Sequence, residues 1–554
     1  MSHVATPSTS QGALSRRQIT GVMVGLMLGM FLASLDQTIV ATSIYTIAND
    51  LDGLSLQAWA TTAYLITSTV STPLYGKLSD IFGRRPLYIA AIAIFLGGSI
   101  FSGSVHSMGE LAVARGIQGL GAGGLMALAL AVIGDIVPLE DRAKFQGYFM
   151  SVFGVSSVLG PVVGGAFAGA NQILWITGWR WVFYVNVPVG IAALVTVFFF
   201  LHLPSRHTRQ RIDYPGAAAI TVGLVPLLLV AEQGRGWGWT SVNSFACYIV
   251  GAIGLAAFVL FEKRAGDYAL IPLRLFKSPQ FSLSALLNFL IGIGMFGAIA
   301  MLPLYLQLVQ GLTPTQAGLL MITFTLGIMT ASITAGRTIS RTSKFKIFPV
   351  IGTLLLAASS ATMGFVLTAD APLWVPAAIA VFFGMGLGCC MQPLVLAMQT
   401  SVPLKDMGVG TSTAAFFRSM GGALGTAVFI SMLFSLAADR VSSAMKTAAT
   451  QADFLRTLHN PAVLADPANK PLFDLLKGGT SGGGLGADSL NDTSWLSKAN
   501  AVLTHPIKDG FSQSVDIVML TAGGLMVLAF LVTLALPNAK LRDPKAASRE
   551  PAAT

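Results

Sequence analysis

The chain has 554 residues, of which 54% are apolar and only 10% are Asp, Glu, Lys or Arg. Soluble proteins carry about 25% charged residues, so most of this surface is unsuited to water, which excludes a string of soluble domains and a disordered chain. The formal charge of +10 lies in short loops and not in a basic groove, so we expect no nucleic-acid partner. The composition indicates an integral membrane protein.

The cysteines and histidines give no sign of a metal centre or of a catalytic group. The cysteines all lie in apolar runs and are too few for a four-ligand metal site or a disulfide framework: Cys247, Cys389 and Cys390. No histidine stands at a metal-binding or triad spacing from an Asp or a Cys. We therefore expect no cofactor and no enzymatic activity.

The apolar residues are grouped into stretches long enough to cross a bilayer. A helix that crosses about 30 Å of hydrocarbon needs about 20 apolar residues, and 13 stretches of at least 18 residues contain no Asp, Glu, Lys or Arg. The stretch 278–336 is 59 residues long and is divided by a turn at 310–314. Because backbone groups in lipid must be bonded within their own segment, these stretches predict an all-α polytopic protein with 14 transmembrane helices.

Lys and Arg predict the orientation of these helices. If the N-terminus is cytoplasmic, the inner segments contain 23 Lys and Arg residues, whereas the short outer loops contain two, Arg180 and Arg235. Positive residues are retained on the cytoplasmic side, so we expect both termini inside a bacterial plasma membrane. Residues 1–17 and 539–554 are then cytoplasmic tails, the first of them disordered.

One predicted outer loop, 438–511, is much longer than the others. It contains seven basic and seven acidic residues and a Gly-rich run at 478–486. Its helical-looking parts are too short for a large domain. We interpret this segment as a flexible cap or as a docking site for an envelope partner.

Three charged residues lie inside predicted spans: Asp36, Arg115 and Arg418. Charges in the membrane are energetically costly and are functional candidates by default. Whether a carboxyl in a low-dielectric site is neutral or charged depends on the groups that face it. Asp36 is therefore a candidate for proton or cation binding, and Arg115 is a candidate for coupling or gating. Each could instead form a purely structural pair. For Arg418 both interpretations stay open, because nearby glycines also indicate close helix packing.

Two glycine-containing motifs stand out. The loop at 76–86 contains two glycines that allow turns, one aspartate and two arginines: Gly76, Gly83, Asp80, Arg84 and Arg85. We expect the arginines to anchor this loop to anionic lipid headgroups. A run of small residues with a helix-kinking proline lies in the fifth span, at Gly160, Pro161, Gly164 and Gly165, and predicts the close approach of another helix.

Together these motifs resemble those of the major facilitator superfamily. The 76–86 loop resembles the signature loop of that superfamily, and 160–165 resembles its antiporter motif. Residues 35–40, 115–119 and 179–190 are similar to motifs of its 14-span drug:proton antiporter family. The resemblance extends from residue 19 to about residue 537, apart from the long outer loop.

The resemblance implies the major facilitator fold, with two six-helix bundles around a central cavity and two additional helices between them. The N-terminal bundle would comprise 18–203, the additional helices 204–277, and the C-terminal bundle 278–437 together with 512–538. The implied function is proton-driven export of amphipathic drugs through a lipid-embedded carrier. The proton gradient would drive it, and no cofactor would be needed.

The resemblance also implies roles for the motif residues. Asp36 would bind the proton or a cation while Arg115 tunes that carboxyl. Asp80, Arg84 and Arg85 would latch the inner gate, and the glycines of the fifth span would limit leakage. The sequence departs from the family pattern at Ser156, where the antiporter motif usually has glycine, and at 41–45, where a proline is missing.

Other functions are less compatible with the sequence. A carrier of the same fold with one physiological cargo, such as a lipid, siderophore or antibiotic, is the nearest alternative, and the long outer loop suits it. Proton-coupled nutrient uptake is less compatible with the glycine-proline run at 160–165, because this run resembles a motif of antiporters. An ATP-driven pump would need a phosphate-binding loop, but the one Gly-Lys pair, Gly76-Lys77, lacks the upstream glycine. A membrane enzyme is the alternative of another class.

Overall fold

The structure is a computed structural model that describes residues 16–51, 57–137, 139–201, 213–312, 314–342, 344–403, 406–470, 472–473, 496 and 499–537. The predicted tail 539–554, the Gly-rich run 478–486 and all but two residues of the predicted tail 1–17 lie outside the described residues. The described part is almost entirely helical, which confirms the predicted all-α class.

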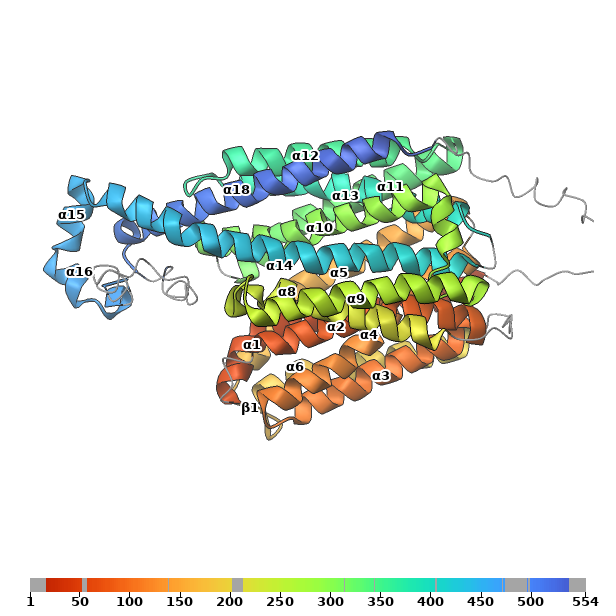
Figure 1. Ribbon diagram of the computed structural model, residues 1–554. Coiled ribbons are helices and arrows are strands. Elements are labelled where there is room, and N and C mark those ends of the chain that lie inside the picture. Colours follow the sequence, from red (N-terminus) through yellow and green to blue (C-terminus); the bar gives the residue numbers. More distant parts are fainter. Residues whose placement is uncertain are drawn as a thin grey trace, which may run out of the picture.

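The N-terminal half is built from helices that run alongside one another (Figure 1). They are α1 (Arg16–Asp50), α2 (Gln57–Phe82), α3 (Arg84–Ser104), α4 (Met108–Ile136), α5 (Leu139–Gly169), α6 (Trp181–Tyr184) and α7 (Asn186–Phe200). Between α5 and α6 lie a two-stranded antiparallel hairpin and a 3-10 turn, namely β1 (Gln172–Ile173), β2 (Ile176–Thr177) and η2 (Gly178–Arg180).

The C-terminal half has the same character, and an additional helical pair lies between the two halves (Figure 1). The pair is α8 (Tyr214–Trp237) and α9 (Val242–Ala265). The C-terminal half consists of α10 (Pro279–Leu308), α11 (Pro314–Thr342), α12 (Ile347–Val366), α13 (Trp374–Thr400), α14 (Met407–Ala448) and α18 (Ala501–Leu534), with α15 (Ala452–Leu458) and α16 (Pro461–Ala465) beyond the bundle.

Each half has its own hydrophobic core. In the N-terminal half, side chains such as Leu26, Phe95 and Phe149 are fully buried in one cluster. A separate cluster in the C-terminal half includes Phe383 and Phe511. The halves meet where α2 packs against α14 and α5 packs against α11, so two separately packed bodies share one seam.

The number of membrane spans is the part of the fold prediction that is not confirmed. Twelve helical segments in the described part of the chain are long and apolar enough to cross a membrane. The other two predicted spans correspond to α2 and α5, which are 26 and 31 residues long but fall outside that set. Helix α2 contains many hydroxyl side chains together with Lys77 and Asp80, which lower its hydropathy. Several positions within α5 lie outside the described residues, to which that set is restricted.

The predicted outer loop 438–511 is helical at both of its ends. Helix α14 continues to Ala448, and α18 already begins at Ala501. The prediction ended the span where the charge-free stretch ends, but Asp439 and Arg440 interrupt the apolar run without breaking the helix, because charged residues are tolerated in a helix outside lipid. Here Gly510 packs directly against Val441, so the two helices remain in contact beyond the predicted span ends.

Candidate functional site

A central cavity lies between the two halves. It has a volume of about 450 Å³ and is lined by residues of α1, α2, α4 and α5 on one side and of α10, α11, α13 and α14 on the other. Hydroxyl and amide side chains line much of the N-terminal wall: Gln37, Thr38, Thr61, Ser68, Thr69 and Thr72. Large apolar side chains line both walls: Met30, Met126, Phe149, Phe153, Met295, Phe296 and Met391. The cavity therefore suits an amphipathic molecule.

A buried ion pair borders this cavity. Arg115 Nη1 on α4 donates a hydrogen bond to Asp36 Oδ2 on α1 at 2.5 Å, and both side chains are buried. The Arg115 guanidinium also lies over the ring of Tyr64, 4.3 Å from its centroid. Removing one member of such a buried pair leaves an uncompensated charge, which costs about 3–5 kcal/mol.

Neutral polar groups complete the coordination of the Asp36 carboxylate. Gln118 Nε2 and Asn186 Nδ2 donate to Asp36 Oδ1 at 2.7 and 2.8 Å. Both amides also donate to Ser99 Oγ, at 3.3 and 2.9 Å. The carboxylate is thus held by residues from three helices besides its own, α3 through Ser99, α4 and α7.

Close helix packing places these groups. An added Cβ at Gly98 of α3 would overlap the backbone of Gln118, and one at Gly119 of α4 would overlap Tyr64 and Thr67 of α2. Larger residues at either glycine would push α4 away from its neighbours. The glycines therefore bring the Arg115 side chain within reach of α1.

Asp36 and Arg115 differ in their access to the cavity. Arg115 is one of the lining residues, whereas Asp36 is fully buried behind it and is not. A molecule in the cavity therefore meets the guanidinium first. This geometry suits Asp36 to a small ligand such as a proton and not to direct contact with a large cation.

Arg418 lines the cavity from the opposite half. It lies on α14 and is partly exposed. Added Cβ atoms at the nearby Gly421 and Gly425 would overlap the backbone of α10, so the close helix packing expected from these glycines is present. Among the described residues, its guanidinium makes neither an ion pair nor a hydrogen bond, so the structure does not bring it together with Asp36 and Arg115.

The residues of the 76–86 loop meet the start of α14. Arg84 bridges Asp80 and Asp135, with nitrogen–oxygen distances of 2.7 and 2.8 Å, and also bonds Ser79. An added Cβ at Gly408, near the first residue of α14, would overlap the Asp80 carboxylate. Because a helix N-terminus attracts negative charge, Asp80 favours contact between α2 and α14.

Other positions of this loop serve its shape and its contacts with both halves. Gly83 has φ of 94° between α2 and α3, a conformation that other residues rarely adopt. Gly76 packs against Ser412 of α14. Arg85 donates to the carbonyl of Phe198 at 2.7 Å and lies over the ring of that residue, so this guanidinium is engaged by the end of α7, in addition to any lipid contact.

The glycines of α5 divide into two groups. Gly160 and Gly164 are in close contact with Thr38 and Thr42 of α1, and Ser43 Oγ donates to the Gly164 carbonyl at 3.1 Å. Gly165 is exposed, and an added Cβ there would meet no atom of the described residues within 4 Å. The expected close packing is thus present at the first two positions and absent at Gly165, which faces away from α1. Pro161 lies within α5, which continues through it.

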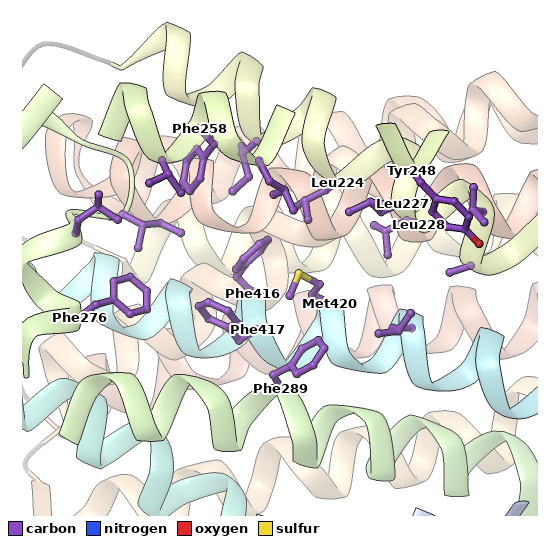
Figure 2. A pocket seen from close by; sticks show the side chains of 18 of the residues that line it. Leu224, Leu227, Leu228, Tyr248, Phe258, Phe276, Phe289, Phe416, Phe417 and Met420 are labelled. Carbon is purple, nitrogen blue, oxygen red and sulfur yellow. The ribbon is translucent and has the colours of Figure 1, made fainter. Parts of the chain in front are cut away.

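A second cavity of about 520 Å³ forms a groove between the additional helices and the C-terminal half. Its lining is almost wholly apolar. Figure 2 shows side chains that point into the groove from α14 and from the facing pair α8 and α9: Phe416, Phe417 and Met420, and Leu224, Leu227, Leu228 and Phe258.

Several residues of the site were not singled out from the sequence. Gln118 and Asn186 lie within recognised motifs but had no assigned role, and Tyr64 and Asp135 had none either. Neutral polar residues in a span give a weak sequence signal because they are tolerated at helix interfaces. Spacing offers one clue for Gln118, which follows Arg115 by three residues and so shares its helix face.

Comparison with known proteins agrees with this architecture. The profile of the family described as Major Facilitator Superfamily matches residues 26–426. The chain belongs to the major facilitator superfamily. It is therefore a transporter and not an enzyme, and the resemblance seen in the sequence motifs is confirmed.

Individual relatives carry related descriptions. The "Multidrug transporter protein MdtP" of Bacillus subtilis is 36% identical over 422 residues, which cover 75% of this chain and 75% of that protein. A "Tetracycline resistance determinant" of Streptomyces rimosus is 38% identical over 321 residues, covering 58% of this chain and 90% of that protein. The proton:xylose symporter XylE has a similar fold, with a TM-score of 0.57 at 16% identity over 96% of this chain and 100% of that one.

Proposed function

We propose that this transporter exports amphipathic small molecules across the bacterial plasma membrane in exchange for protons. The observation that carries the proposal is the buried Asp36–Arg115 pair beside a cavity between two separately packed halves. The descriptions of the bacterial relatives as multidrug and tetracycline resistance proteins support export of such compounds.

In this mechanism Asp36 is the proton site. A proton on its carboxyl removes the negative charge that holds Arg115, so the tie between α1 and α4 weakens. Gln118 and Asn186 still hold the neutral carboxyl in place. The altered packing of α1 against α4 changes the balance between the two orientations of the halves, as expected of a carrier that rocks around a central site.

The remaining motif residues control that motion. Asp80, which is paired with Arg84, lies against Gly408 at the start of α14 in the conformation seen here. We assign Asp80 and Arg84 to the cytoplasmic gate on the basis of the positive-inside rule. Gly160 and Gly164 keep α1 and α5 in contact and so limit leakage of protons between them. We also keep the segment 438–511 as the candidate docking site for an envelope partner.

The decisive experiment is dye transport in everted vesicles with an imposed proton gradient. We expect Asp36→Asn to abolish gradient-driven uptake, because the amide is nearly isosteric but exchanges no proton. The matched control is Asp50→Asn, since Asp50 ends the same helix and accepts a bond from Trp179 Nε1 at 2.6 Å, away from the cavity. Full transport by Asp36→Asn, or transport by the wild type that a protonophore leaves unchanged, would contradict the mechanism.

A further inference from the structure

Arg418 is a cavity-lining charge that the proton mechanism does not use. Helix α14 presents two faces, one to the apolar groove and one to the central cavity. Phe416 and Met420 point into the groove (Figure 2). Arg418 lies two positions from each of them, about 200° around the helix, and lines the cavity together with Ser419. The guanidinium is thus presented where cargo would bind.

The charges around the cavity do not balance. Its lining includes two formally charged side chains among the described residues, Arg115 and Arg418, and both are cationic. Asp36 neutralises Arg115. The described residues provide no carboxylate for Arg418, which makes no ion pair or hydrogen bond with them. A cation without a counter-charge inside the membrane is unfavourable, so an anionic group in the cavity would stabilise this arrangement.

The surroundings of Arg418 define the rest of such a ligand. Gln392, also a lining residue, is buried and its Oε1 has no hydrogen-bond partner among the described residues, so an acceptor is open for a hydroxyl or N–H group. Met295, Phe296 and Met391 form an apolar, adaptable wall from the same half.

We infer that the cargo carries an acidic group, a carboxylate or an enolate, on a largely apolar body, and that Arg418 binds this group. The inference rests on the proposed export function and specifies its substrate class. The planar guanidinium suits paired hydrogen bonds to two oxygens. A zwitterion satisfies the requirement as well as an anion does.

The test uses two dyes with the same xanthene body, tetramethylrhodamine with its free carboxylate and the corresponding methyl ester. Binding to the purified full-length protein is measured by fluorescence polarisation. We expect the wild type to bind the carboxylate dye about tenfold or more tightly than the ester, as one charge-assisted contact implies. Arg418→Gln should remove this preference and Arg418→Lys should retain part of it. The control Met420→Leu, on the groove face of α14, should retain all of it.

Ester binding serves as the internal control for folding of each variant. If the wild type binds both dyes equally, or if Arg418→Gln weakens both by the same factor, the inference is wrong while the proposed export function stands. If the wild type binds neither dye, the cavity is not the cargo site, and both proposals are contradicted. If Arg418→Gln fails to fold and binds neither dye, Arg418→Lys takes its place, and a reduced preference for the carboxylate at unchanged ester affinity in that variant supports the inference.

Discussion

Thr38 of α1 donates a hydrogen bond to the carbonyl of Ser156 on α5 at 3.0 Å, and the same side chain lies against Gly160 one turn further along α5. The two helices are therefore in backbone contact beside the central cavity. Ser156 is fully buried, so serine in place of the usual glycine of the motif does not prevent this approach.

Gly160→Ala should destabilise the protein, because the added methyl group would overlap Thr38. We expect a loss of about 1–3 kcal/mol, typical of overpacking, measured by thermal unfolding in detergent. Gly165→Ala on the same helix is the control, since no atom in the described part of the chain lies within 4 Å of the added one. It should be neutral or slightly stabilising because alanine favours helix. Equal effects of the two substitutions would contradict the packing described here.

The buried pair predicts strong non-additivity between its two members. Arg115→Gln alone leaves the Asp36 carboxylate without its counter-charge and should cost about 3–5 kcal/mol. The double variant Asp36→Asn/Arg115→Gln should be destabilised by much less than the sum of the single variants. Unfolding of all four proteins by denaturant measures the coupling. Additive losses would show that the two charges do not interact in the membrane.

The contact between Asp80 and Gly408 predicts a shift in conformation. Gly408→Val should displace the carboxylate and favour separation of α2 from α14 at this end. In everted vesicles we expect an impermeant maleimide to label a Ser419→Cys reporter in the cavity several-fold faster in this background. Gly97→Val on α3 should leave the labelling rate unchanged, because an added Cβ there meets none of the described residues within 4 Å. If Gly408→Val leaves the labelling rate unchanged, the contact between Asp80 and Gly408 has no part in the gate.

Orientation is open to direct measurement. Gln451 lies exposed beyond α14, and Phe82 lies exposed at the end of α2. With both termini cytoplasmic, Gln451→Cys should react with an impermeant maleimide in intact cells, whereas Phe82→Cys should react only in everted vesicles. The opposite pattern would invert the topology and, with it, the assigned direction of transport.

The sequence alone predicted the helical class and the charged members of the site for one physical reason. Hydrocarbon forces the backbone into helices and makes an ionised side chain conspicuous, so Asp36, Arg115 and Arg418 could be singled out from a single chain. Whether such charges meet depends on the rotation and register of separate helices. Rotation and register depend on how small residues such as Gly98 and Gly119 pack against neighbouring helices, and these contacts cannot be predicted from a single sequence.

The predictions that differed from the structure failed for related reasons. The predicted span ends at residue 438, whereas helix α14 continues to Ala448, because absence of charge indicates burial in lipid and not helix length. Gly165 was grouped with Gly160 and Gly164 by its proximity in the chain, although it lies on a different side of α5. The neutral ligands of Asp36, such as Asn186, could not be distinguished from ordinary polar residues at a helix interface.

The length of α14 has a mechanical consequence. It has 42 residues and is therefore a rod of about 63 Å, fastened to α2 at one end and to α18 at the other. A tilt of about 10° around its middle would move its two tips in opposite directions by about 5 Å each. A single rigid-body tilt of α14 would then weaken its contacts at one membrane surface and strengthen its contacts at the other.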